Sequence, residues 1–398
     1  MMFPCRSIVA HIDIESEEEL AALAAGKQVT ASQIGPCTLR ILAGTFEHTA
    51  RCPYPVQGAQ VKCNFDKKKR QIRLVMPVYQ ALEGAGYPFD PFPVLQHAEY
   101  TPWNIHHIYV DRMPKLDLRN AIRNPEKHRW ISRHIVTQTS DREKFVQHCT
   151  NPAKRHPSEV LANIKDVIAT LVYVYAGIKQ ASRSIFVFRE PSHGIFMAIC
   201  VAGLRLDLAG ATVVLDAAFV PWSSEVAKLL DSHIPVHEVE IQAGDVPSWH
   251  RLSVAFVERC RTWTHEPNCE YKSTGNAPLS VHIEKNPLCT CGQGVGFESP
   301  DWKTAAWHVI LPHGTRAAIS PLFGVSYLER QFGPGSKLQD AKQPISWHEP
   351  TNKCWHCGGT GKSLMGCQKC KKARYCSKDC QGKHWKAEHK HVCKPPGH

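Results

Sequence analysis

The sequence predicts an α+β body of mixed strands and helices, followed by a small cysteine-rich segment at its C-terminal end. Helical and strand-like patterns follow one another without the regular alternation of a parallel α/β sheet, which indicates the α+β class. Seven of the 17 cysteines lie between Cys354 and Cys393. The 398 residues suffice for two or three domains, and no apolar run is long enough to predict a membrane span.

Residues 1–125 are predicted to form a β-rich region. A helix is expected to begin at Ser16, because a serine N-cap followed by three acidic residues suits the positive end of a helix dipole, and to end at Gly26. The basic run at 67–70 is interpreted as a solvated hairpin turn, with a nuclear import signal as the alternative. Apolar residues then recur at every second position, as in a half-buried strand: Ile72, Leu74, Met76 and Val78.

Residues 126–330 are predicted to form a second, α+β region of the body. Helices are expected to start at three serines that can act as N-caps, Ser158, Ser223 and Ser248. Apolar runs predict strands between these helices: Ile185–Phe188, Phe196–Leu204 and Thr212–Val220. Residues 331–352 are polar and glycine-containing, which favours a linker.

The N-terminus lacks the basic and apolar regions of a signal peptide, so we expect an intracellular protein of the nucleus, the cytoplasm or both. Disulfides are rare in those reducing compartments, and clustered cysteines there more often hold metal ions. The seven cysteines that stand alone along the chain are interpreted as small buried hydrophobes.

The C-terminal cysteines form an array of four ligand pairs. Pairs separated by two residues suit knuckle turns, and pairs separated by three can share one face of a helix. Eight Cys and His ligands fill two closed tetrahedral zinc sites, which would stabilise a segment too short to bury a core. Spacing alone leaves open whether adjacent or alternate pairs share an ion. The pairs are Cys354 and Cys357, Cys367 and Cys370, Cys376 and Cys380, and His389 and Cys393.

With these residues in view, the stretch ARYCSKDCQGKHWKAEHKHVC resembles a MYND-type zinc finger, which places that finger at 353–393. The resemblance implies one zinc on Cys354, Cys357, Cys376 and Cys380, and a second on Cys367, Cys370, His389 and Cys393. MYND fingers take short proline-rich peptides, and by resemblance the contacts would come from Gln368, Gln381, Trp385 and Tyr375. His384 and His391 lie off the family's ligand positions and are expected at the surface.

The body resembles, more weakly, the body of fungal proteins that end in the same finger and whose activity is uncharacterised. The stretches that carry this resemblance are CRTWTHEPNCEY, PLCTCGQG and AGATVVLDAAFVPW. The resemblance implies no chemistry.

The favoured function is a zinc-binding adaptor or regulatory protein with proline-rich segments of other proteins as partners. Residues 351–398 carry a formal charge of +9, which falls to +6 because seven thiolates and two Zn²⁺ together add −3, and this weakens the case for nucleic acid. The Asn-His-x-Cys motif of SET methyltransferases and common hydrolase motifs are absent. The alternative is an unrecognised enzyme in the body, with the finger as a recruitment module; it would show a deep pocket with convergent polar groups.

A third zinc site is predicted in the body, on His265, Cys269, Cys289 and Cys291. The first two residues are four apart and can share one side of a turn, and the Cys-x-Cys pair can reach one ion from a tight loop. Gly292 and Gly294 are expected to give that loop conformational freedom. Cys260 is a rival ligand, but it continues a helical apolar stripe and is assigned to the core.

Overall fold

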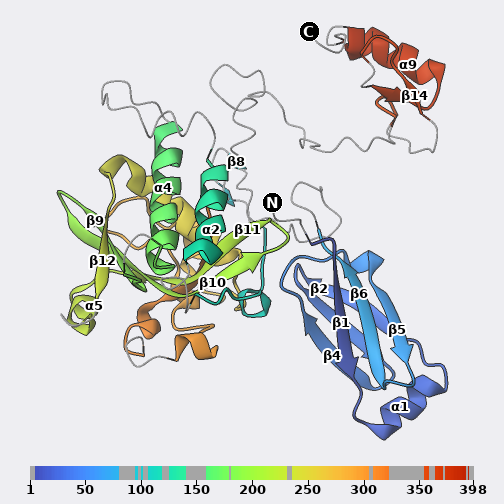
Figure 1. The fold of residues 1–398 in the computed structure, drawn as a ribbon, viewed down its shortest axis with the longest axis horizontal. Coiled ribbons are helices and arrows are strands. Elements are labelled where there is room, and N and C mark those ends of the chain that lie inside the picture. The colour runs from blue at the N-terminus through green and yellow to red at the C-terminus, as the bar shows by residue number, and fades with distance from the viewer. Residues whose placement is uncertain are drawn as a thin grey trace. The chain divides into compact units, whose positions relative to one another are not determined.

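The computed structural model divides into two compact units, a body and a C-terminal finger (Figure 1). The described residues of both predicted body regions fall in the first unit, and the predicted linker lies outside the described residues. None of the helices described is both long and apolar enough to cross a bilayer. The structure describes residues 5–79, 95–96, 100–101, 106–118, 125–139, 158–178, 181–230, 235–303, 308–321, 354–357, 364–370, 373–390 and 393.

The N-terminal part of the body consists of two three-stranded antiparallel sheets, ordered β1-β6-β5 and β2-β3-β4 (Figure 1). Apolar side chains of both sheets, together with Leu23 of helix α1 (Glu17–Ala24), form one shared core. The strands are β1 (Ser7–Asp13), β2 (Thr30–Gly35), β3 (Thr38–Ala43), β4 (Phe46–Arg51), β5 (Lys62–Asp66) and β6 (Gln71–Pro77).

The period-two pattern correctly predicted strand β6. Ile72 and Leu74 are 0% exposed, whereas Arg73 between them faces solvent, as expected for a strand with one buried face. The basic run that precedes β6 is a hairpin turn. In it, the Asp66 carboxylate accepts hydrogen bonds from the backbone N–H groups of Lys68 and Lys69. Helix α1 begins as predicted, with the Ser16 hydroxyl accepting from the backbone N–H of Glu19.

The rest of the body is built on a five-stranded mixed sheet with the order β12-β9-β10-β11-β13. All neighbours are antiparallel except β12 and β9, which run parallel. The three strands expected from the sequence form, each somewhat longer than predicted. The bounds are β9 (Ile185–Glu190), β10 (Gly194–Asp207), β11 (Thr212–Pro221), β12 (Val236–Glu240) and β13 (Thr315–Ile319); the short strands β7 (Leu95–Gln96) and β8 (Tyr100–Thr101) pair separately.

Helices cover this sheet on both faces. Phe186 and Phe188 of β9 belong to a core shared with α2 (Pro125–Thr137), α4 (Ser158–Tyr175) and α6 (Val246–Glu258). Ile185 and Val187 point to the opposite face, which α5 (Ser224–Leu229) and Trp302 cover. Successive side chains of a strand alternate between faces, so β9 contributes to two cores.

Helices start at two of the three serines predicted to begin one, and the third helix starts at a different residue. Ser223 caps α5, since its hydroxyl accepts the backbone N–H of Val226. Helix α6 begins at Val246 rather than Ser248, because Pro247 fits the first turn, where its missing N–H has no intrahelical partner to lose. The remaining helix of the body is α7 (Glu270–Thr274), and short 3₁₀ turns follow it at Thr290–Gly292, Pro300–Trp302 and Leu311–His313.

A buried ion network crosses three neighbouring strands of this sheet, β10, β11 and the edge strand β13. Asp216 of β11 is 0% exposed and accepts hydrogen bonds from Arg205 of β10 at 3.0 Å and from Arg316 of β13 at 3.0 Å. Arg316 also donates to both carboxylate oxygens of Asp111, at 2.6 and 2.9 Å. Burial alone would lower the pKa of Arg316, but the two carboxylates raise it above its usual value.

The finger has little regular structure. Strands β14 (Met365–Gly366) and β15 (Arg374–Tyr375) form a short antiparallel pair, and helix α9 (Lys378–His384) continues into the π-helical turn η10 (Trp385–His389). Its buried interior consists of Ala373 and Tyr375 together with buried cysteines, against which two half-buried tryptophans pack. So small an apolar interior would not by itself be expected to stabilise the finger.

Candidate metal centres

The first finger cluster joins a knuckle turn to the start of helix α9. Its members are Cys354 and Cys357 on the knuckle, Cys376 before the helix, and Cys380 in its first turn. The Ser377 hydroxyl between them accepts the backbone N–H of Cys380 at 3.1 Å, which fixes the start of the helix. The sulfur of Cys376 lies 3.5 Å from that of Cys357 and 3.5 Å from that of Cys380.

The second finger cluster joins the other knuckle to the end of the π-helical turn. Nε2 of His389 lies 3.4 Å from the sulfur of Cys367 and 3.5 Å from that of Cys370. The sulfur of Cys393 lies 3.8 Å from that of Cys367. All four side chains are buried.

These separations fit tetrahedral zinc sites. Sulfur atoms about 2.3 Å from a tetrahedral Zn²⁺ lie about 3.8 Å from one another, and a sulfur and an imidazole nitrogen lie about 3.5 Å apart. The S–S distances of 3.5 to 3.8 Å and the N–S distances of 3.4 and 3.5 Å match these values. A disulfide would require about 2.05 Å. Both clusters are therefore able to bind zinc.

The backbone of the first cluster favours the thiolate that zinc requires. Burial would raise the pKa of Cys354, but hydrogen bonds from the backbone at Cys357, Cys376 and His356 lower it to about 6. A thiol with this pKa is mostly deprotonated at neutral pH and so ready to bind a metal ion.

The clusters combine alternate ligand pairs, the interleaved arrangement that the resemblance to MYND fingers implied. Cys354 and Cys357 lie with the third pair, and Cys367 and Cys370 with the fourth. The spacing of the pairs could not distinguish this arrangement from the sequential one.

The residues expected to contact a peptide do not all reach the surface. Gln368 is exposed, and Gln381 and Trp385 are half-buried. Tyr375 is 0% exposed, and its hydroxyl is hydrogen-bonded to Nδ1 of His384 at 3.0 Å, so its expected role in peptide contact is wrong. His384 is half-buried rather than at the surface as expected, and His391 lies outside the described residues.

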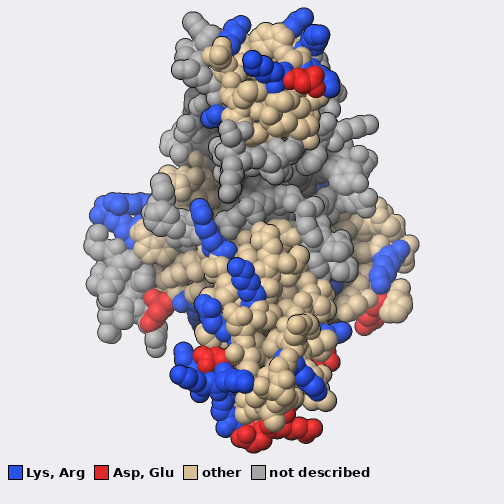
Figure 2. All heavy atoms as spheres, turned by 90° about the vertical axis from the view of Figure 1, so that its right-hand side faces the viewer, with Lys and Arg blue, Asp and Glu red and all other residues tan. Residues whose placement is uncertain are grey.

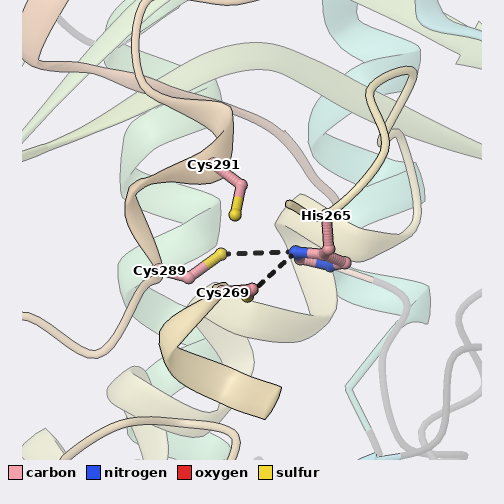
Figure 3. A group of neighbouring side chains, drawn as sticks. All are labelled: His265, Cys269, Cys289 and Cys291. Atoms are coloured by element: carbon pink, nitrogen blue, oxygen red, sulfur yellow. Dashed lines mark hydrogen bonds between the residues drawn. The ribbon is translucent and has the colours of Figure 1, made fainter. Parts of the chain in front are cut away.

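The structure also brings together the four residues predicted to form a site in the body (Figure 3). His265 follows helix α6, Cys269 is the N-cap residue of α7, and Cys289 and Cys291 lie on the turn beyond it. Nδ1 of His265 lies 3.4 Å from the sulfur of Cys269 and 3.5 Å from that of Cys289. All four possible ligand atoms lie within 4.8 Å of one another.

A carboxylate that the sequence analysis missed lies behind this histidine. Nε2 of His265 is 3.1 Å from Glu258, the last residue of α6, and the Arg261 guanidinium donates to the same carboxylate at 2.8 Å. Burial would raise the pKa of Glu258, but His265 and Arg261 lower it, while the hydrogen bond to Glu258 raises the pKa of His265. Glutamate and histidine seven residues apart form no recognisable motif, because their contact depends on how the chain turns after α6.

Gly292, next to Cys291, is required for a close approach rather than for conformational freedom. A Cβ atom there would lie 2.2 Å from a ring carbon of Trp263. Gly294 does have the predicted freedom, with φ +72°. Cys260, the rival ligand, lies in a core cluster with its thiol directed at backbone carbonyl groups.

Replacing Gly292 with alanine should lower the free energy of unfolding of the body by about 1–3 kcal/mol, since the methyl group forces the Trp263 ring or the loop to move. Urea denaturation of the full chain measures this change. Gly244→Ala is the matched control, because a Cβ at Gly244 meets nothing within 4 Å. Equal stability of the two variants would show that the loop accommodates the added methyl group without strain.

A hollow of about 200 Å³ in the body bears on the enzymatic alternative. Its lining includes His193 and His250, but these side chains are held by neighbours, the first by Glu190 at 2.8 Å and the second by the backbone carbonyl of Ser280 at 3.0 Å. Burial lowers the pKa of His250. Hydrogen-bonded histidines occur in catalytic and non-catalytic sites alike, so the enzymatic alternative stays a prediction.

Two closed clusters of Cys and His ligands in a segment with almost no apolar core define a structural zinc finger. Residues 354–393 match the family model described as the MYND finger, so the chain carries a MYND finger, a class of protein-interaction module. In addition, 64 residues, or 15% of this chain, are 39% identical to Tudor domain-containing protein 1 of Oryzias latipes. This match spans 5% of that protein's length.

Proposed function

We propose that the protein is an adaptor or regulatory protein whose finger, holding one zinc in each of its two clusters, captures extended proline-rich segments of partner proteins. The observation that carries this proposal is the half-buried Trp385, which packs on a metal-ligand histidine and keeps part of its ring accessible. A partly exposed tryptophan offers a rigid, flat apolar surface, and proline-rich segments bind such surfaces because they are already extended.

Three of the expected contact residues are connected through the second zinc cluster. Gln381 and Trp385 are four residues apart on a helical segment, so they lie on one face. The Trp385 ring lies 5.6 Å from that of His389, whose Nε2 is 3.4 Å from Cys367. Gln368 follows Cys367 directly on the exposed part of the knuckle, which supports a contact surface along this cluster.

The distribution of charge supports a protein partner over nucleic acid. In Figure 2, the basic side chains of the described residues lie in several small groups, some of them beside acidic side chains. In the finger, Lys383 is paired with Asp379 at 2.8 Å. A nucleic-acid surface typically gathers its Lys and Arg side chains into one basic patch or stripe.

Replacing Trp385 with alanine should weaken binding of a proline-rich peptide by at least about tenfold, because an interface tryptophan typically contributes about 2 kcal/mol or more. Fluorescence anisotropy with a labelled proline-rich peptide and the full chain measures the affinity. Zinc content is determined on each sample to show that the finger remains loaded.

Val9→Ala is the matched control, because Val9 is a 46% exposed apolar side chain of the body. It should leave the affinity unchanged. If the Trp385→Ala protein keeps its zinc and binds the peptide as tightly as the parent, the proposed surface is wrong.

A further inference from the structure

The long segment that follows α6 has little regular structure to hold it in place. Between Arg261 and Gly314 it contains only α7 and three short 3₁₀ turns among the described residues. It nevertheless brings Cys269 and Cys289 together from positions 20 residues apart and buries both, at 1% and 5% exposure. A chain without strands or long helices needs another source of order to keep three thiols and an imidazole converging.

We propose that the body binds one structural Zn²⁺ through Nδ1 of His265 and the sulfurs of Cys269, Cys289 and Cys291, and that Glu258 orients the histidine. In Figure 3 the four side chains point toward a common centre. The N–S distances of 3.4 and 3.5 Å equal those in the second finger cluster. Three sulfurs and one imidazole are a donor set typical of closed zinc sites.

The contact with Glu258 assigns the two nitrogens of His265 different roles. A carboxylate accepts a hydrogen bond, so Nε2 carries the proton and donates it to Glu258, 3.1 Å away. Nδ1 is then the nitrogen with a free lone pair, and it faces the sulfurs. A carboxylate behind a ligating histidine fixes its orientation and strengthens its bond to the metal.

Other contacts position the cysteine-bearing turn against α7. The Glu270 carboxylate accepts hydrogen bonds from both the hydroxyl and the backbone N–H of Thr290, at 2.7 and 3.3 Å. Thr290 lies between Cys289 and Cys291, so this contact sets the direction of both sulfurs. The Tyr271 ring lies 5.7 Å from that of His265 and covers it on one side.

A zinc ion at this place would tie the loop to the end of α6. All four coordination positions are taken by protein side chains, so no position remains for water or substrate, and the role is structural. The site does not depend on the finger, because its ligands and its Glu258 support all lie in the body.

Zinc stoichiometry of the full chain tests the site. With Cys357 and Cys370 replaced by serine to disable both finger clusters, the protein should keep one zinc per chain. Adding Cys289→Ser should remove it, whereas adding Cys63→Ser, a half-buried cysteine of strand β5, should not. Absence of zinc from the finger-disabled protein, or one zinc retained with Cys289→Ser, would overturn the proposal while leaving the function of the finger untouched.

A second variant tests the role of Glu258 without removing a ligand. In the finger-disabled protein, Glu258→Gln should weaken zinc binding about 10- to 100-fold in competition with a chelator, and should shift the absorption bands of the Co²⁺-substituted site. Glu266→Gln makes the same change in charge at an exposed carboxylate next to His265 and should alter neither. Equal affinities and spectra for the two variants would exclude Glu258 from the site.

Discussion

Replacing Cys370 with serine should unfold the finger and leave the melting transition of the body unchanged. The side chain belongs to a buried cluster whose zinc would supply most of the folding free energy of the finger, since structural zinc binding is worth about 10–16 kcal/mol in small domains. The body is a separate compact unit with its own cores. NMR spectra should lose the dispersed finger resonances, and calorimetry should retain the transition of the body.

Cys63→Ser is the control for loss of a cysteine outside the clusters, and it should leave both the spectra and the zinc content unchanged. Chelation of zinc from the parent protein should reproduce the loss of the finger resonances. A folded finger in the Cys370→Ser protein, with undiminished zinc, would show that this cluster does not hold the finger together.

Replacing Asp216 with alanine should lower the free energy of unfolding of the body by about 3–5 kcal/mol, the usual cost of removing one partner from a buried ion pair. Asp216 is the carboxylate to which both Arg205 and Arg316 donate, and all three residues are at most 4% exposed. Its loss leaves Arg205 and Arg316 close together within the sheet. Urea denaturation of the full chain, followed through the transition of the body, measures the change.

Glu238→Gln is the matched control, because Glu238 pairs with Arg189 at 3.0 Å on strands of the same sheet but both side chains are about half exposed. Exposed pairs contribute at most about 1 kcal/mol. If Asp216→Ala costs no more than this control, the network is held by something other than its central carboxylate.

Local patterns in the sequence were sufficient to predict some elements of the fold, but not the outer strands β1, β12 and β13 or helix α2. The alternation around Ile72 and the serine caps at Ser16 and Ser223 act over a few neighbouring residues, so they can be recognised without the fold. Helix α6 begins two residues before the predicted Ser248, because the proline at 247 fits the first helical turn.

The candidate sites were predictable where chemistry and spacing coincide. Cysteine and histidine pairs identified all eight finger ligands, but their partition into two clusters depends on how the knuckles fold together. Tyr375 was misassigned because a family landmark does not say to which side of a two-residue strand its ring points. Glu258 escaped prediction because its contact with His265 exists only in three dimensions.

The π-helical turn η10 places Trp385 and His389 on the same five residues, with their rings 5.6 Å apart. A ligand that packs on this tryptophan would therefore act on the same structural element as a zinc ligand. Thermodynamic linkage makes this coupling reciprocal. If bound zinc changes the affinity of the finger for the ligand by a given factor, the bound ligand changes the affinity of the finger for zinc by the same factor. If the ion favours partner binding, occupancy of the finger by a partner would raise its affinity for zinc by the same factor, and zinc availability would set how much partner is held.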